Sequence, residues 1–305
     1  MKRIVILKFV IVFIALSLIQ SSFIICVQAQ DEETFNPHWV HTTNGYRYKT
    51  DFNRYATGWL EVEDKKYYLT KAGYAIENSF YTLDDNKYYF GTRGVMQTGW
   101  KNISEKIYYF NGEGIMQTGS QEIDNKVYYF NDSGVMQTGW KKYSGNWYYH
   151  KSSGEAQTGW KKIEGVWYYF NEKGVMLTGL QEIGSKKYYL EKSGAMAVGW
   201  KYISNHWYYF ASSGAMVQEK WVKYEEQWYY LDASGVMVTD KWVKDSDKWY
   251  YLNASGVMVT DQWKQSSGKW YYLDSTGTLA KGWNTISGKR YYFDKNGVWD
   301  KDKKE

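Results

Sequence analysis

Alternating aromatic and polar residues recur along the chain in units of 20 or 21 residues. Each unit holds two short runs that favour β-strands, joined by a tight turn such as Ser144-Gly145, an arrangement typical of a β-hairpin. A unit of this length leaves no room for the helix that a parallel crossover needs. The pattern therefore predicts an all-β chain built of hairpins.

The repeat is aligned on one position, which usually follows a glycine. A Tyr-Tyr pair follows most of these positions by eight residues, and every methionine except Met1 lies two residues after a glycine. Because an isolated hairpin is marginal in water, we expect about thirteen hairpins to stack into an elongated solenoid over residues 39–299. The aligned positions are Trp39, Trp59, Phe80, Trp100, Ser120, Trp140, Trp160, Leu180, Trp200, Trp221, Trp242, Trp263 and Trp283.

Strand alternation sorts the side chains of each hairpin onto two faces. The last strand position is Phe or Leu in most units, as in Phe170, so the face that it shares with the preceding Tyr168 is predicted to point to the core. Trp160, Trp167 and Tyr169 are then expected to face outward. His150 occupies the Phe/Leu position and is predicted to be a buried histidine whose polar atoms are satisfied.

Aromatic residues make up 20% of the chain, an excess that no ordinary core requires. Large aromatic side chains exposed at the same position of many repeats indicate a ligand-binding surface. The alternative is that they only pack neighbouring hairpins together, a role that Leu or Ile would serve equally well. Basic and acidic residues are interspersed, and this distribution argues against binding of nucleic acid.

The first 29 residues have the features of a secretory signal peptide. Lys2, Arg3 and Lys8 lead into an apolar run that ends near Ala29, and they account for three of the five net positive charges. The alternative of a retained membrane anchor stays open, since the run is long enough to span. Cys26 lies in this segment, so the secreted chain would hold no disulfide. Residues 30–38 form a short N-terminal segment and residues 300–305 a charged tail.

The repeats leave little sequence for a catalytic domain. An enzyme needs a set of dissimilar residues in one pocket, whereas this chain repeats the same surface. His38 and His41 have no evident third metal ligand, and Asp84-Asp85 is typical of a turn. We therefore expect a non-catalytic protein without a metal or other cofactor.

The units GWKKIEGVWYYFNEKGVMLTG (159–179) and KWVKYEEQWYYLDASGVMVTD (220–240) resemble the cell-wall-binding repeats of choline-binding proteins from Gram-positive bacteria and their phages. Related repeats occur in glucan-binding domains and clostridial toxins. The resemblance implies a secreted protein attached to the cell surface, which binds choline groups of teichoic acids through aromatic cages between consecutive repeats. Binding of a glucan is the alternative. The ends of a solenoid leave hydrophobic surface uncapped, so a homodimer formed through the terminal repeats is also possible.

In the resembling proteins each cage combines two tryptophans of one repeat with a tyrosine of the next. Strand alternation favours the second tyrosine of each pair as the third member of the cage, and the first tyrosine remains the alternative. The implied choline-binding cages are Trp140, Trp147 and Tyr169; Trp160, Trp167 and Tyr189; Trp200, Trp207 and Tyr230; Trp221, Trp228 and Tyr251; Trp242, Trp249 and Tyr272; and Trp263, Trp270 and Tyr292.

Six other units lack the second tryptophan. A cation at this position would repel a cationic ligand, so these units are expected to be spacers or to bind something else. The replacing residues are Lys66, Lys87, Ile107, Val127, Lys187 and Arg290.

Overall fold

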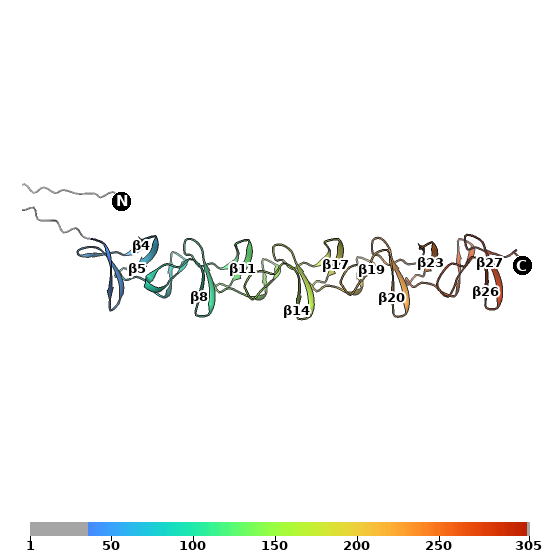
Figure 1. Cartoon of the computed structure of the whole chain (residues 1–305), viewed down its shortest axis with the longest axis horizontal. Helices are drawn as coiled ribbons and strands as arrows, with labels where there is room; N and C mark the ends of the chain where they lie inside the picture. Colours follow the sequence, from blue (N-terminus) through green and yellow to red (C-terminus); the bar gives the residue numbers. More distant parts are fainter. Residues whose placement is uncertain (1–35, 304–305) are drawn as a thin grey trace, which may run out of the picture. The chain divides into compact units, whose positions relative to one another are not determined.

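The computed structural model describes residues 36–303 as a succession of antiparallel β-hairpins (Figure 1). The predicted signal peptide lies outside the described residues. The all-β class and the thirteen hairpins that the repeat predicts are confirmed. One short 3-10 turn, η1 (Thr92–Gly94), is present. No helix in residues 36–303 has the length and apolar character needed to cross a membrane.

The strands are short and mostly five residues long. In chain order they are β1 (His38–Thr42), β2 (Gly45–Asp51), β3 (Arg54–Tyr55), β4 (Gly58–Val62), β5 (Lys65–Leu69), β6 (Ser79–Leu83), β7 (Asn86–Phe90), β8 (Gly99–Ile103), β9 (Lys106–Phe110), β10 (Gly119–Ile123), β11 (Lys126–Phe130), β12 (Gly139–Tyr143), β13 (Asn146–His150), β14 (Gly159–Ile163), β15 (Val166–Phe170), β16 (Gly179–Ile183), β17 (Lys186–Leu190), β18 (Gly199–Ile203), β19 (His206–Phe210), β20 (Lys220–Tyr224), β21 (Gln227–Leu231), β22 (Lys241–Asp245), β23 (Lys248–Leu252), β24 (Gln262–Ser266), β25 (Lys269–Leu273), β26 (Gly282–Ile286), β27 (Lys289–Phe293) and β28 (Trp299–Asp300).

The chain divides into two compact units. One holds the chain up to Ser79 together with Phe90–Met96, and it includes the sheet β1-β2-β3 and the hairpin β4-β5. The other holds Phe80–Tyr89 and the chain from Gln97 onward, and it contains all six predicted cages.

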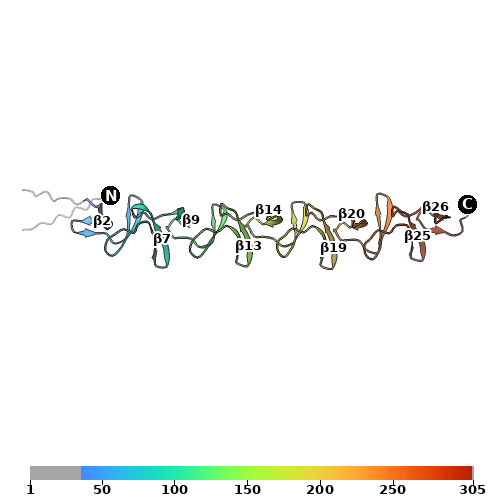
Figure 2. The ribbon, with the colours of Figure 1, turned by 90° about the horizontal axis from the view of Figure 1, so that it is seen from below.

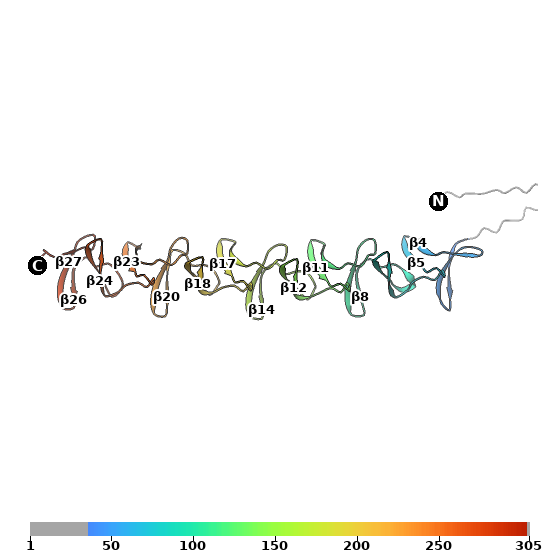
Figure 3. The same cartoon turned by 180° about the vertical axis from the view of Figure 1, so that it is seen from behind.

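In the larger unit the hairpins follow one another along one axis, and every third hairpin points in the same direction. Figure 1 shows this for the hairpins that contain β8, β14, β20 and β26, and the view from behind in Figure 3 shows it again. Figure 2 shows it for the hairpins that contain β13, β19 and β25. Three consecutive hairpins therefore complete one turn about the axis.

The tight turn predicted at Ser144-Gly145 is present, with φ of 49° and 78° at these two residues. Positive φ at both central residues is the mark of a type I′ turn, whose twist matches that of the flanking strands. Several other turns place two non-glycine residues in this conformation, among them Glu225-Glu226 with φ of 47° and 62°.

A connector between consecutive hairpins links them through the backbone. In the connector after β17, the Met196 N–H donates to the Trp167 carbonyl of the preceding hairpin at 2.8 Å. The next N–H, of Ala197, donates to the Tyr189 carbonyl of its own hairpin at 2.8 Å. The same pair of bonds recurs along the larger unit, so each connector fixes two hairpins against one another.

The core runs through the Phe/Leu position, as predicted. Phe170 and its equivalents are fully buried, and Ile163 on the same face is 8% exposed. The connector glycines explain the confinement of methionine: a Cβ on Gly256, whose φ is 77°, would lie 2.7 Å from Cε of Met237 in the preceding connector. The methionine side chain therefore occupies the space that the absent Cβ leaves.

Candidate ligand-binding site

The aromatic residues meet where one hairpin faces the next. Trp160 pairs with Tyr169 and Lys162 pairs with Trp167 in the register of β14 and β15, so both tryptophans and the second tyrosine share one face. The first tyrosine and the core residue lie on the opposite face. In the larger unit, the face with two tryptophans lies against the opposite face of the following hairpin, and the rings meet in this gap.

Three of these gaps contain open cavities, of about 370, 410 and 220 Å³. Each is lined by both tryptophans of one hairpin and the first tyrosine of the next, with a Met or Leu from the connector that follows. A polar residue from one connector further on completes the wall. The three sets are Trp160, Trp167, Tyr188, Met196, Ser212 and Ser213; Trp200, Trp207, Tyr224, Tyr229, Met237 and Ser255; and Trp242, Trp249, Tyr271, Leu279 and Asn296.

The geometry thus brings the two tryptophans of each predicted cage together, but it places a different tyrosine beside them. Trp160 lies 4.8 Å from the ring of Tyr188, the first tyrosine, with the planes at 63°. The same contact is made by Tyr168, Tyr229, Tyr250, Tyr271 and Tyr291 at 4.9–5.2 Å.

The second tyrosine of each pair packs against the tryptophan of its own hairpin, as Tyr169 does on Trp160 at 5.1 Å. The choice of Tyr169, Tyr189, Tyr230, Tyr251, Tyr272 and Tyr292 as the third wall is therefore wrong in geometry. The alternation argument identified the faces correctly, but the following hairpin presents its other face, which carries the first tyrosine.

The two tryptophans differ in exposure. The first is half-buried between hairpins, whereas the second, such as Trp207 at 43%, remains open to solvent at the rim. The expectation that Trp160 faces outward is wrong to this extent, because Tyr188 of the next hairpin packs against its ring. In four cages the two indoles stand nearly perpendicular at 6.2–6.5 Å. We use "cage" for the two tryptophans and the first tyrosine of the next hairpin.

The last cage, of Trp263, Trp270 and Tyr291, has a fourth aromatic wall. Trp299 in β28 stands where other repeats have methionine, two residues after the connector glycine. Its ring lies 5.3 Å from Trp263 and 5.7 Å from Tyr291. This tryptophan closes the cage at the end of the repeats.

In two incomplete repeats a cation of the chain itself covers the aromatic ring. Lys87 Nζ lies 4.8 Å from the centre of Phe80, and Arg290 Cζ lies 5.1 Å from the centre of Trp283. A ring face already occupied by an internal cation is less available to an external one.

The repeat that begins at Ser120 is filled from within. Tyr143, at the position that is Ile163 in the next unit, inserts its ring between Tyr129 at 4.5 Å and Tyr148 at 3.9 Å, with planes within 8°. It takes the place of the tryptophan that Ser120 replaces. Burial raises the pKa of Tyr143.

His150, in the core position, is 1% exposed and its ring is satisfied as predicted. Nδ1 lies 2.8 Å from the Gly154 carbonyl oxygen, and Nε2 lies 3.3 Å from the Tyr143 hydroxyl. Burial lowers the pKa of this histidine.

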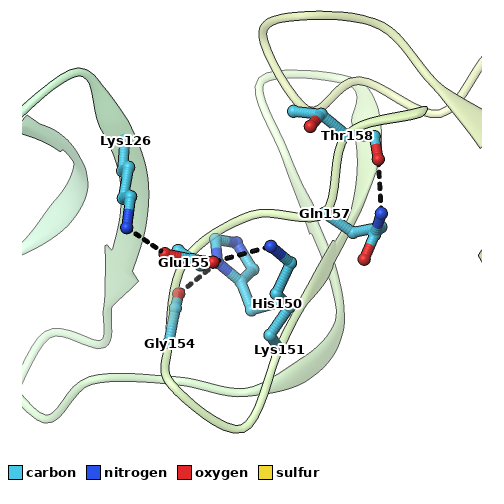
Figure 4. A network of polar contacts seen from close by, with 7 residues as sticks. All are labelled: Lys126, His150, Lys151, Gly154, Glu155, Gln157 and Thr158. Atoms are coloured by element: carbon cyan, nitrogen blue, oxygen red, sulfur yellow. Dashed lines mark hydrogen bonds and ion pairs between the residues drawn. The ribbon is translucent and has the colours of Figure 1, made fainter.

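At the same level, the gap equivalent to a cage is a cavity of about 510 Å³, lined by charged residues as well as by Val127, Ala156, Tyr169 and Phe170. Figure 4 shows its ionic cluster: Glu155 accepts from Lys126 Nζ at 2.8 Å and from Lys151 Nζ at 2.6 Å. These two hydrogen bonds lower the pKa of Glu155 to about 2. Ser120 and Val127 thus replace the two tryptophans of a complete cage here, although Tyr169 and Phe170 still line the cavity.

No group of three or more His, Cys, Asp or Glu side chains in residues 36–303 is placed to hold a metal ion. His38 and His41 are both exposed, and the Asp84-Asp85 pair forms the turn between β6 and β7 with φ of 46° and 64°.

Sequence reasoning missed the connector residues that complete the cavities, such as Ser213, Ser255 and Asn296. Each directly precedes a connector glycine, but it lies two repeats after the tryptophans that it faces. Their shared place before the glycine was visible in the sequence, whereas their distance from the tryptophans hid the connection.

Family models match most of the chain. The choline-binding repeat matches residues 117–157, 157–199, 177–221, 197–242 and 241–281. The cell wall binding repeat matches residues 57–75, 78–96, 98–116 and 281–298. Comparison with curated protein sequences finds no match.

Two similar proteins of solved structure come from Streptococcus pneumoniae. Choline binding protein F is 32% identical over 82% of this chain and 100% of its own, with a TM-score of 0.52. The same protein in the presence of a peptidoglycan analogue, a tetrasaccharide-pentapeptide, is 31% identical over 88% and 100%, with a TM-score of 0.53. CbpJ is 31% identical over 87% and 100%, with a TM-score of 0.52.

Proposed function

This chain belongs to the choline-binding repeat family, and from that premise we propose that its six cages bind the choline groups of cell-wall teichoic acid. The observation that carries the proposal is the convergence of three aromatic rings on one gap, as in Trp200, Trp207 and Tyr229. Ring faces carry partial negative charge and attract a quaternary ammonium ion. Such an ion has no N–H to donate, so a wall made chiefly of ring faces suits it.

The strength of one cage follows from its exposure. Cation–π contacts are worth about 0.5–2 kcal/mol each, and three of them less the ordering cost correspond to a dissociation constant of about 1 mM. Because the second tryptophan at the rim is near 40% exposed, we expect the energy of each cation–π contact to lie in the lower part of this range. A single cage is thus a weak, reversible site.

Several cages on one chain make a firm attachment from weak sites. Teichoic acid presents many choline groups on one polymer, and linked binding events raise avidity by about 10²–10⁴. We propose that the secreted protein is held at the cell surface in this way and that it has no catalytic activity of its own. The match of the repeats to most of the chain supports this proposal.

The test replaces the second tryptophan of all six cages by alanine. The mature chain and this variant are titrated with choline chloride, with matched NaCl as the salt control, and tryptophan fluorescence is followed. A saturable choline response at millimolar concentration, lost in the variant, is expected. The substituted residues are Trp147, Trp167, Trp207, Trp228, Trp249 and Trp270.

A matched control removes tryptophans from incomplete repeats, by substitution of Trp59, Trp100 and Trp283 with alanine. The first two are 46% and 38% exposed, so each of them is about as exposed as a tryptophan replaced in the six-site variant. This control should respond to choline as the wild type does, and free choline should release it from choline-bearing walls. A choline response that survives in the six-site variant would contradict the proposal. A response to dextran alone would support the glucan-binding alternative.

A further inference from the structure

Eight connectors carry a methionine two residues after their glycine, and some of these sulfurs are open to solvent. Resting on the proposed function, we propose that Met196 and Met237 are sites of reversible oxidation by hydrogen peroxide, which reaches each sulfur through the open cage that the methionine lines. Choline in the cage shields the sulfur, and oxidation of the sulfur weakens the binding of choline. The cage therefore responds to an oxidant as well as to its ligand.

The exposure of a connector methionine follows the gap that it faces. Each methionine donates its N–H, at 2.7–2.8 Å, to the carbonyl of the residue at the position of the second tryptophan, and this bond identifies the gap. Where that residue is lysine, the methionine is buried, at 8–9% exposure. Where it is tryptophan, the methionine is partly exposed. The buried methionines are Met96, Met116 and Met216, and the partly exposed ones are Met176, Met196, Met237 and Met258.

Two of the partly exposed methionines line cavities that open to solvent. Met196 lies in the wall of the cavity of about 370 Å³ and Met237 in that of about 410 Å³. Hydrogen peroxide has only two heavy atoms, and each cavity is many times the volume of about 30 Å³ that one water molecule takes up in the liquid. The oxidant can therefore reach both sulfurs unless a ligand fills the cage.

The reaction transfers one oxygen atom to the thioether. A lone pair of the sulfur attacks one peroxide oxygen, an S–O bond forms and the O–O bond breaks, and after proton transfer the second oxygen leaves as water. The sulfur is oxidised by two electrons and the peroxide is reduced. The product is methionine sulfoxide, a polar and chiral side chain that sulfoxide reductases return to methionine.

The packing of the sulfur gives the oxidation its effect. A Cβ on Gly256 would lie 2.7 Å from Cε and 2.8 Å from Sδ of Met237, so there is no room for an added oxygen on that side. The oxygen must turn into the cage, where it holds water, or displace the connector, whose Met237 N–H is bonded to the Trp207 carbonyl at 2.8 Å. A thioether contact with an aromatic ring changes an equilibrium constant by about two- to tenfold, and we expect choline affinity to fall by this factor.

The chain holds its own controls. Two cages have Leu279 and Trp299 where the others have methionine, and neither residue can form a sulfoxide. Met136 is partly exposed, but the residue at the position of the second tryptophan in its gap is Ile107. Peroxide should therefore oxidise Met136 whether or not choline is present.

The first experiment treats the mature chain with hydrogen peroxide, in choline chloride or in matched NaCl, and measures sulfoxide formation at each methionine by peptide mass spectrometry. In NaCl, Met196 and Met237 should react faster than Met216. Choline at ten times its dissociation constant should slow both by about tenfold, because only about one cage in ten is then empty. The rate at Met136 should not change.

The second experiment follows tryptophan fluorescence in choline titrations of the untreated, the oxidised and the reductase-treated chain. Oxidation should raise the choline midpoint by about two- to tenfold, and reduction should restore it. A variant that carries leucine, the residue found at 279, at the four partly exposed cage positions should show the same midpoint before and after peroxide. Its substitutions are Met176→Leu, Met196→Leu, Met237→Leu and Met258→Leu.

Three results would overturn the inference while the choline response of the untreated chain stands. These are equal oxidation of Met196 and Met216, oxidation of Met196 and Met237 that choline does not slow, and a midpoint that oxidation leaves unchanged or raises equally in the leucine variant. If choline produced no fluorescence response in the untreated chain, the proposed function itself would fail, and this inference with it.

Discussion

The ring of Tyr143 fills the space of the tryptophan that the preceding repeat lacks at Ser120. This compensation can be tested by substitutions at both positions. Tyr143→Ile restores the residue found at 163, but it removes both stacked contacts, with Tyr129 and Tyr148. Aromatic pairs contribute about 0.5–1.5 kcal/mol each beyond their buried area, so the loss should be about 1–3 kcal/mol. Ser120→Trp alone should also destabilise, by about 1–3 kcal/mol, because its indole would compete with Tyr143 for the same space.

The double variant should recover most of this loss. In Ser120→Trp with Tyr143→Ile, the indole occupies the gap that the phenol leaves, as Trp140 does one repeat later between Tyr149 and Tyr168. The single losses sum to about 2–6 kcal/mol, and we expect a favourable coupling energy of about 1–3 kcal/mol between the two sites.

Local free energies of opening, from native-state amide hydrogen exchange in β10 to β13, are the suitable measurement, since a chain of many repeats need not unfold in two states. The control Tyr143→Phe keeps both stacked contacts and loses only the hydroxyl that contacts His150. It should cost less than Tyr143→Ile. Strictly additive losses in the double variant would refute the idea that Tyr143 substitutes for the missing tryptophan.

Other predictions concern the core, the connectors and pH. Phe170→Ala, at a fully buried position, should destabilise by about 3–5 kcal/mol in local hydrogen exchange, whereas Trp167→Ala, at 40% exposure, should chiefly reduce choline binding. Gly256→Ala should destabilise more than Gly268→Ala in the same assay: both have φ above 70°, but only the first Cβ would meet a methionine; equal losses would contradict the packing argument. The folded-state pKa of Glu155, about 2 against an ordinary 4.5, is lowered by its two lysine partners. Its stabilising contribution should be complete above about pH 4.5 and disappear as pH falls toward 2, and Glu155→Gln should lack this part of a urea-midpoint pH profile.

The sequence was sufficient to predict what depends on neighbours along the strand. Alternation and turn spacing predict the hairpin unit, the buried Phe170 position and the placement of Trp160 and Trp167 on one face. The structure shows all three. The tyrosine was misassigned because the choice depends on which face the following hairpin presents, a property of the stacking. The contact of Tyr143 with Tyr129 could not be predicted from the sequence either, because it depends on Ser120, 23 residues earlier.

In the larger unit three consecutive hairpins complete one turn about the axis, and this rotation determines the direction in which each cage opens. Cages that begin at Trp140, Trp200 and Trp263 are separated by three hairpins each and therefore open toward the same side, while those at Trp160 and Trp221 open toward a second side and that at Trp242 toward a third. A flat, rigid array of ligands could then engage only one such set at a time. A flexible polymer that winds around the axis could reach all six, so the fold favours thread-like ligands over planar ones.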